Sequence, residues 1–459
     1  MATNKYEVVV AGSGVGGLCS AALLAHHGYK VLLVEALERL GGRLSTIEKE
    51  GFKIPTGAVA LPSREGPLFE TFKTVGAPFE LREIGPPSIW IEGEWHELPE
   101  KGQIKAMLTI LDKVGANKAK LMGAMGKQAV TEKVTSAFRR DREKVDPSSL
   151  MSVRDWLKQY TDDERVIQVF HSVTSSLTTV NDFEYPVSHF FNFLSSGGQG
   201  GLHYVGIAPR GNVELANSLC NALKSKGGEV WTNSPLEKII IKDGRVSGVL
   251  IQKDGQQVEV ETGVLISNIG PRETIKLTDR SNFSHDFLKQ VDGLMAVPIV
   301  HTLVASDKPL TPVKGVAMVS GVKRVVNSMP LTPFCPELAP PGQHLMVVWG
   351  TPATSKGPIN KEEEIAANMD DIRIVYPDFD KHGRIIHMEA RDIDDPFPAL
   401  RSWMGYDMDQ ETPLTNMFFA GDGAKPFGWE GTPSCAQGAK LIVAMIRKKF
   451  KPGKILKGG

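Results

Sequence analysis

The 459-residue chain carries 53 basic and 53 acidic side chains, so its formal charge is zero, and 41% of its residues are hydrophobic. This length exceeds what one hydrophobic core supports and predicts two domains. The balanced charge gives no reason to expect a nucleic acid partner, and no stretch reaches the ~18 apolar residues of a membrane span. The four scattered cysteines show no pairing pattern and fit a reducing compartment, so we expect a cytoplasmic protein.

A strand, a glycine-rich turn, a helix and a second strand open the chain. Strands are predicted over 6–11 and 30–34, where the residues are apolar and β-branched, and a helix is predicted over 15–27. The glycine spacing is that of a dinucleotide-binding turn, in which the backbone approaches a pyrophosphate at the helix N-terminus. Glu35 ends the second strand, where its carboxylate can accept both ribose hydroxyls and would repel a 2′-phosphate. The expected cofactor contacts here are Gly12, Gly14, Val15, Gly16, Gly17, Glu35 and Ala36.

A glycine pair shortly after Glu35 favours FAD over NAD. An ordinary nicotinamide domain would begin its next helix here, whereas two glycines let the chain pass close to a cofactor. Arg43 can donate a fork of hydrogen bonds to phosphate, although a surface arginine in a loop is the alternative. The further expected contacts are Gly41, Gly42, Arg43, Gly57 and Ala58.

Two later segments continue the same type of domain. A helix is predicted from Pro209 to Leu223, followed by strands with hairpin turns at 243–244 and 254–255. A last helix is predicted over 435–448. Its predicted N-cap is Thr432 or Ser434, with Pro433 suited to the first turn.

Together these segments resemble the FAD superfamily that holds flavin amine oxidases, phytoene desaturases and carotenoid isomerases. The resemblance spans nearly the whole chain, and residues 227–271 are closer to the phytoene desaturase branch. It implies that the backbone of Leu236 meets the adenine, that Asp422 holds the ribityl chain or pyrophosphate, and that the last helix points its N-terminus at the flavin. The contacts implied in these segments are Leu236, Asn268, Gly421, Asp422, Gly431, Thr432 and Pro433. No cysteine precedes Phe418 where some amine oxidases attach flavin, so FAD is expected to bind noncovalently.

The order of the segments predicts an α/β fold in which two domains are interleaved. A Rossmann-type FAD-binding domain is expected from residues 1–70, 205–285 and 405–459, and an α+β substrate domain from residues 71–204 and 286–404. The substrate domain is expected to carry a helical insertion over 102–160, a mixed sheet with strands over 297–304, 316–326 and 344–348, and a helix over 361–375.

The helical insertion combines lysines with an apolar face. In lipid-handling relatives this region helps to meet the membrane, and a basic amphipathic stretch is suited to that contact. Residues 101–145 are therefore a candidate for peripheral membrane contact. A helix pair with a solvated lysine face is the alternative.

Catalytic side chains are weakly signalled, because a flavin carries the hard chemical step and the protein supplies shape and electrostatics. Candidates are residues that the family fold brings towards the substrate, with ordinary packing as the alternative for each: Glu430, Trp429, Tyr204, Arg391 and Trp403. His301 lies in an apolar run and is expected to be a core residue. The eleven histidines show no metal-ligand spacing, so no metal is expected.

Three functions are compatible with this pattern. The first is a desaturase-like dehydrogenase that takes hydride from a C–C unit of a small, apolar cyclic or isoprenoid substrate to flavin N5. Its electron acceptor is unidentified, oxygen or a quinone being examples, and redox-neutral isomerisation is a sub-case. The second is an amine oxidase, and the third is a non-enzymatic prenyl-binding module of the same fold. We favour the first, because residues 227–271 lean to the desaturases and no two-aromatic cage can be assigned securely from Trp403 and Trp429.

Overall fold

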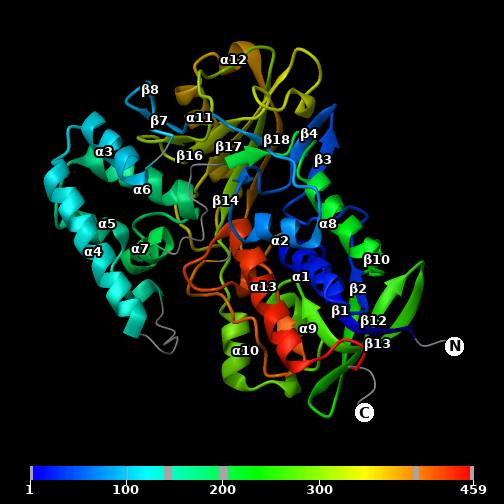
Figure 1. The fold of residues 1–459 in the computed structure, drawn as a ribbon. Coiled ribbons are helices and arrows are strands. Elements are labelled where there is room, and N and C mark those ends of the chain that lie inside the picture. The colour runs from blue at the N-terminus through cyan, green and yellow to red at the C-terminus, as the bar shows by residue number, and fades with distance from the viewer. Residues whose placement is uncertain (1–3, 101, 139–146, 196–204, 396–402, 455–459) are drawn as a thin grey trace.

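The computed structural model describes residues 4–100, 102–138, 147–195, 205–395 and 403–454. Two large sheets organise the chain, with helices α3 to α7 gathered on one side of the molecule (Figure 1). Each sheet draws its strands from separate parts of the sequence. The predicted interleaved α/β architecture is therefore confirmed, while the exact domain boundaries stay predictions.

The first sheet combines the N-terminal, middle and C-terminal segments. Its strand order is β10-β2-β1-β13-β12-β11, and β19 also pairs with β13. The pairs β1–β2, β1–β13, β2–β10 and β13–β19 are parallel, whereas β11, β12 and β13 form an antiparallel meander. The strands are β1 (Asn4–Ala11), β2 (Val31–Val34), β10 (Glu229–Trp231), β11 (Leu236–Lys242), β12 (Arg245–Lys253), β13 (Gln256–Ser267) and β19 (Met417–Phe419).

Four helices pack beside this sheet: α1 (Val15–His26), α2 (Pro67–Val75), α8 (Val213–Ser225) and α13 (Gly431–Lys449). Two predicted helix starts are wrong. Helix α8 begins at Val213, because the chain turns at Gly211 with φ +94°. Helix α13 has Glu430 at its cap position, with no side-chain cap. The hydroxyl of Ser434 instead donates to the carbonyl of Gly431 at 2.6 Å, so the predicted capping by Thr432 or Ser434 does not occur.

The second sheet has the order β18-β14-β17-β16-β15-β7-β8. Only β7–β15 is a parallel pair among these strands, so the predicted mixed sheet is confirmed. The strand predicted over 316–326 is two strands, because the chain turns at Gly321 with φ +85°. The strands are β7 (Ser88–Ile91), β8 (Glu94–Glu97), β14 (Ile299–Ser306), β15 (Ala317–Val319), β16 (Val325–Pro330), β17 (His344–Gly350) and β18 (Gly383–Arg391).

The helical insertion has a core of its own, which includes Trp156, Phe170 and Phe190. It comprises α3 (Gln103–Lys113), α4 (Lys118–Phe138), α5 (Val153–Lys158), α6 (Glu164–Thr178) and α7 (Val187–Ser195). Of the helices that the structure describes, none combines the length and apolarity needed to cross a bilayer.

The other elements are short connections and covering helices. They are β3 (Thr46–Lys49), β4 (Phe52–Pro55), β5 (Leu61–Pro62), β6 (Arg82–Glu83), β9 (Val205–Ile207), α9 (Pro271–Lys276), α10 (His285–Asp292), α11 (Lys361–Val375) and α12 (Phe379–His382). Helix α11 coincides with the helix predicted from its acidic start.

Candidate functional site

A cavity of about 1600 Å³ lies where the two sheets and the helical insertion meet. Drug-sized ligands occupy roughly 300–1,000 Å³, so this space can hold a large cofactor together with a substrate. One half is formed by turns that follow the carboxyl ends of β1, β2, β13 and β19. Ligands of open α/β sheets bind at such strand ends.

The glycines of this half meet around the side chain of Asn268. A Cβ on Gly14 would lie 2.6 Å from Asn268 Nδ2, and a Cβ on Gly16 would lie 2.6 Å from the backbone nitrogen of Gly421. A Cβ on Gly421 would lie 2.6 Å from Asn268 Oδ1. These glycines are thus required by close approach. The buried Oδ1 of Asn268 has no hydrogen-bond partner among the described residues, which leaves an acceptor for a ligand at this wall of the cavity.

Glu35 is held in place at the glycine-lined end of the cavity. Its Oε2 accepts hydrogen bonds from the backbone nitrogen of Ser13 at 2.8 Å and from Ser13 Oγ at 2.5 Å, and its Oε1 accepts from Leu37 N at 3.0 Å. The carboxylate is 9% exposed and lines the cavity. Sequence analysis missed Ser13, whose only signal is its place between Gly12 and Gly14.

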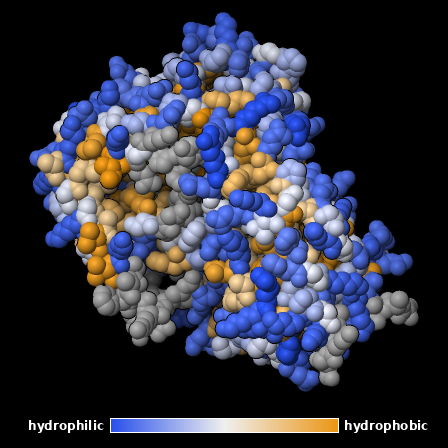
Figure 2. All heavy atoms as spheres, in the orientation of Figure 1, coloured by the Kyte–Doolittle hydropathy of each residue, from blue (hydrophilic) through white to orange (hydrophobic). Residues whose placement is uncertain are grey.

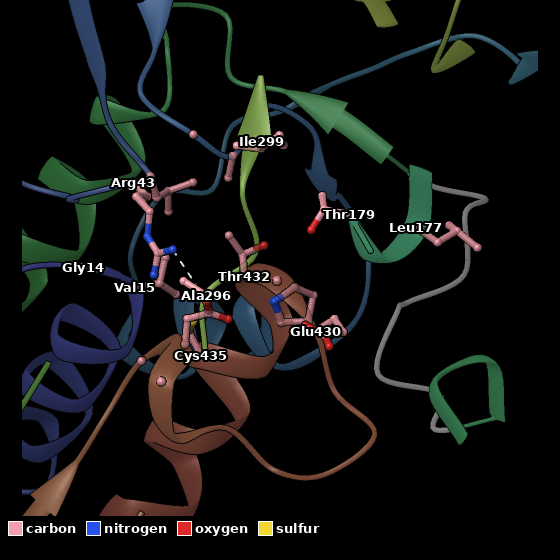
Figure 3. Close-up of a pocket in the computed structure, with 18 of the residues that line it drawn as sticks. Gly14, Val15, Arg43, Leu177, Thr179, Ala296, Ile299, Glu430, Thr432 and Cys435 are labelled. Atoms are coloured by element: carbon pink, nitrogen blue, oxygen red, sulfur yellow. Dashed lines mark ion pairs between the residues drawn. The ribbon is translucent and has the colours of Figure 1, made fainter. Parts of the chain in front are cut away.

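Arg43 and Asp422 join the first and last glycine-rich segments. Arg43 Nη1 lies 3.6 Å from Asp422 Oδ2, and Figure 3 shows Arg43 reaching towards the start of α13, where Thr432, Glu430 and Cys435 lie. Arg43 therefore lies at the cavity wall and not in a solvent-facing loop. Its guanidinium can donate to phosphate oxygens.

Lys425 is a buried cation that sequence analysis missed. Its side chain is 0% exposed, and its Nζ lies 2.6 Å from Glu430 Oε2 and 3.5 Å from Asp422 Oδ1. Although burial acts to lower it, the charges of Asp422 and Glu430 keep the pKa of Lys425 above its usual value. Removing one member of a buried ion pair typically costs about 3–5 kcal/mol. Lys425 therefore ties the turn after β19 to the start of α13; the short spacing of the three residues was the available signal.

The structure brings nearly all predicted cofactor contacts together in one cavity. All predicted cofactor contacts except Gly17 line the cavity. Gly17 instead packs against the carbonyl of Gly12, where a Cβ would collide, as expected for close helix–strand packing.

Of the predicted catalytic residues, Glu430 lines the cavity and is paired with Lys425. Trp403 is buried against Tyr406, Trp429 follows a turn at Pro426, and Arg391 donates to Glu389. These three are absent from the described cavity wall, and Tyr204 lies outside the described residues. Catalytic roles for these residues stay predictions.

The second half of the cavity is apolar. Its described wall between residues 98 and 195 and between 296 and 351 contains no charged side chain. Aromatic rings come from α7 and β17, and sequence analysis missed them as site residues. The large apolar lining residues include Leu98, Ile104, Met107, Ile110, Met122, Met125, Leu177, Phe190, Phe191, Phe193, Leu194, Ile299, Met318, Met329 and Trp349.

Comparison with known proteins agrees with this geometry. The 15-cis-phytoene desaturase of Synechococcus elongatus is 22% identical over 443 residues, covering 91% of this chain and 90% of the relative. Among solved structures, an oxidoreductase from Methanosarcina mazei has a TM-score of 0.77 at 23% identity, covering 96% of this chain and 100% of that one. A putrescine oxidase variant has a TM-score of 0.72 at 15% identity, covering 97% and 100%.

The profile of the family described as flavin containing amine oxidoreductase matches residues 15–439. This match covers most of the chain, from Val15 at the start of α1 to a point within α13. The chain belongs to this family and is a flavin-containing oxidoreductase.

Proposed function

We propose that the protein binds FAD noncovalently in the glycine-lined half of the cavity. The backbone around Gly14 and the N-terminus of α1 suit the pyrophosphate, because free amides and the helix dipole favour negative charge. Glu35 suits the adenosine ribose, and Arg43 lies where it can donate to phosphate. When bound, FAD supplies the hydride acceptor.

Noncovalent attachment is supported by the state of the cavity cysteine. Cys435 is the one cysteine among the described lining residues. Burial, together with the charge of Asp422, raises the pKa of its thiol to about 12. The thiolate is the nucleophilic form, so this thiol is inert at neutral pH.

For the reaction, we propose a desaturase-like dehydrogenation of a C–C unit in an apolar cyclic or isoprenoid compound. The observation that carries the proposal is the uncharged, Met- and Phe-rich half of the cavity beside the cofactor cradle. Such walls hold a substrate by burial of apolar surface and exclude water. The described wall between residues 98 and 195 and between 296 and 351 offers no carboxylate to a charged amine, although Glu273, Asp394 and Asp395 line other parts of the cavity and the putrescine oxidase variant shares this fold. The phytoene desaturase relative also supports the assignment.

Two features of the chain would influence the reaction at the flavin: the N-terminus of α13 and the Lys425–Glu430 ion pair. The first-turn amides of α13 have no side-chain cap from Glu430, so the positive end of this helix can favour negative charge on a ligand. Lys425 fixes Glu430 at the cavity wall. The N-terminus of α13 thus stabilises negative charge on a ligand, and Lys425 holds Glu430 in position. The apolar wall orients the substrate.

We also propose that the edge formed by α3 and α4 meets anionic lipid, from which an apolar substrate would enter. Ile104, Val130 and Val134 are 66%, 64% and 52% exposed, and Figure 2 shows hydrophobic side chains gathered on this side of the molecule. Ile104 also lines the cavity. Exposed lysines such as Lys105 and Lys127 on the same helices can contact lipid phosphate.

Purified protein is expected to be yellow and to release its flavin on heat denaturation. The released compound should be FAD by chromatography, because the cradle fits a dinucleotide and Cys435 is protonated. Flavin that precipitates with the denatured chain would contradict noncovalent binding.

The variant Gly16→Ala is expected to lose most of its flavin, because the added Cβ would collide with the backbone of Gly421. The flavin-to-protein absorbance ratio measures the loss. Gly123→Ala is the matched control, since nothing lies within 4 Å of a Cβ there. Full occupancy in the Gly16 variant would show that the two turns do not form the cradle.

Under anaerobic conditions, cyclic or isoprenoid alkenes and ketones are expected to bleach the flavin absorbance, and simple amines are not. An amine oxidase binds the free base, so its bleaching rate would rise with pH through the amine pKa. Reoxidation should be slow in air and faster with an added quinone. Rapid bleaching by amines with that pH profile would replace the dehydrogenase assignment, and isomerised product without net bleaching would indicate the redox-neutral sub-case.

The wild-type protein is expected to co-sediment with vesicles containing phosphatidylserine and to lose this binding in high salt. The double variant Val130→Ser/Val134→Ser should bind less, because apolar surface is lost. Ile374→Ser is the control, since Ile374 is an exposed apolar residue (57%) on α11. Equal binding by all three proteins would exclude the α3–α4 edge as the contact.

A further inference from the structure

Two histidines and a glutamate converge on one face of the second sheet. His301 lies on β14, and His387 and Glu389 lie on the neighbouring strand β18. The antiparallel register pairs His301 with Glu389 and Leu303 with His387, so alternation places all three side chains on one face. One ligand atom from each residue, a ring nitrogen of each histidine and a carboxylate oxygen of Glu389, lies within 4.8 Å of the other two.

The buried imidazole of His301 has no hydrogen-bond partner among the described residues. The side chain is 1% exposed, and the missing partner concerns both ring nitrogens. Buried polar groups are nearly always satisfied, and leaving one unpaired costs about 1–3 kcal/mol. Burial, reinforced by the positive charge of Arg391, lowers the pKa of His301 to about 3. The imidazole is therefore neutral at pH 7 and has a lone pair available.

Glu389 supplies the negative charge of the cluster. Its Oε1 lies 3.1 Å from His387 Nε2 and accepts a hydrogen bond from Arg391 Nε at 2.8 Å. Although burial acts to raise it, these contacts lower the pKa of Glu389 to about 2. The carboxylate is thus ionised and oriented. Arg391 also contributes a competing positive charge, which lowers the affinity of the cluster for a cation.

We propose that His301, His387 and Glu389 bind one divalent transition-metal ion, with Zn²⁺ the favoured occupant. Two imidazoles and a carboxylate are a characteristic zinc ligand set, with bonds of about 2.0–2.2 Å and a fourth position for water. The ion takes the lone pair of His301 that nothing else uses. Sequence spacing gave no indication of the site, because His301 is distant in the chain and meets β18 only through strand pairing.

The cluster adjoins the cofactor cavity, because strand alternation places His301 on the same face of the second sheet as Ile299 and Trp349, which line the cavity. None of the three ligands is among the described cavity-lining residues. Ile299 lies two positions before His301 on β14 and faces the cavity in Figure 3. Trp349 lies on β17 directly opposite His301 and also lines the cavity. A bound ion would hold β14 to β18 and stiffen this wall.

The test uses the flavin-loaded protein, treated with EDTA, dialysed and titrated with ZnCl₂ by calorimetry. We expect one Zn²⁺ per chain and an increase in Tm that grows with the logarithm of the ZnCl₂ concentration above the dissociation constant. Co²⁺ should give the strong visible absorption of a four-coordinate ion. These readouts do not depend on turnover, so they are independent of the proposed reaction.

Variants decide whether the ion binds at this cluster. His387→Ala and Glu389→Gln should weaken Zn²⁺ binding by at least about tenfold, and both changes are at half-buried positions that the fold should tolerate. His382→Ala is the matched control, because His382 also pairs a carboxylate, at 2.9 Å from Asp307, outside the cluster. Absence of Zn²⁺ binding by the wild-type protein, or unchanged binding by the His387 variant, would overturn the proposal.

Discussion

The close approach of two glycine-rich turns around Asn268 is the constraint on which the site depends. Gly14 and Gly16 follow β1, Gly421 follows β19, and Asn268 follows β13, which lies between those two strands in the sheet. There is no room for a side chain at any of the three glycines. The cradle therefore exists only when strands from the two ends and the middle of the chain are in register. The packing of these strands, more than the conformation of any single turn, determines whether the cradle forms.

Charge is divided sharply along the cavity. The glycine-lined half gathers Glu35, Arg43, Asp422 and Glu430, and further charged side chains come from residues 272–276 and 394–395, while the described wall between residues 98 and 195 and between 296 and 351 is uncharged. Lys425 lies behind this boundary with its ammonium fully enclosed by protein. Because water is excluded, the electrostatic attraction between Lys425 and its carboxylate partners is stronger than it would be in solvent. The cavity thus combines a polar, preorganised end with an apolar end, which is the division that the proposed binding of a flavin and an apolar substrate requires.

Features encoded within a few adjacent residues could be predicted from the sequence. The strand–turn–helix at the N-terminus, helix α11 and the contact residues of both glycine-rich segments belong to this class. Features that depend on pairing between distant segments could not be predicted. The burial of Lys425 needs the folded turn after β19, and the meeting of His301 with Glu389 needs the register of two strands. The prediction that Ser434 caps the last helix was wrong for a local reason, because its hydroxyl donates a hydrogen bond to the carbonyl of Gly431 in the same turn.

The pairing of β1 with β13 has a consequence for biosynthesis. Asn4 pairs with Val260 and Ala11 with Ser267, so the central strand of the first sheet has no partner on that side until more than half of the chain has been made. At about 5–20 residues per second, a ribosome needs roughly 10–50 s to deliver β13. During that interval an apolar strand, buried on both faces in the finished protein, has an open edge. Such edges can pair with other chains, so fragments that contain β1 without β13 should aggregate.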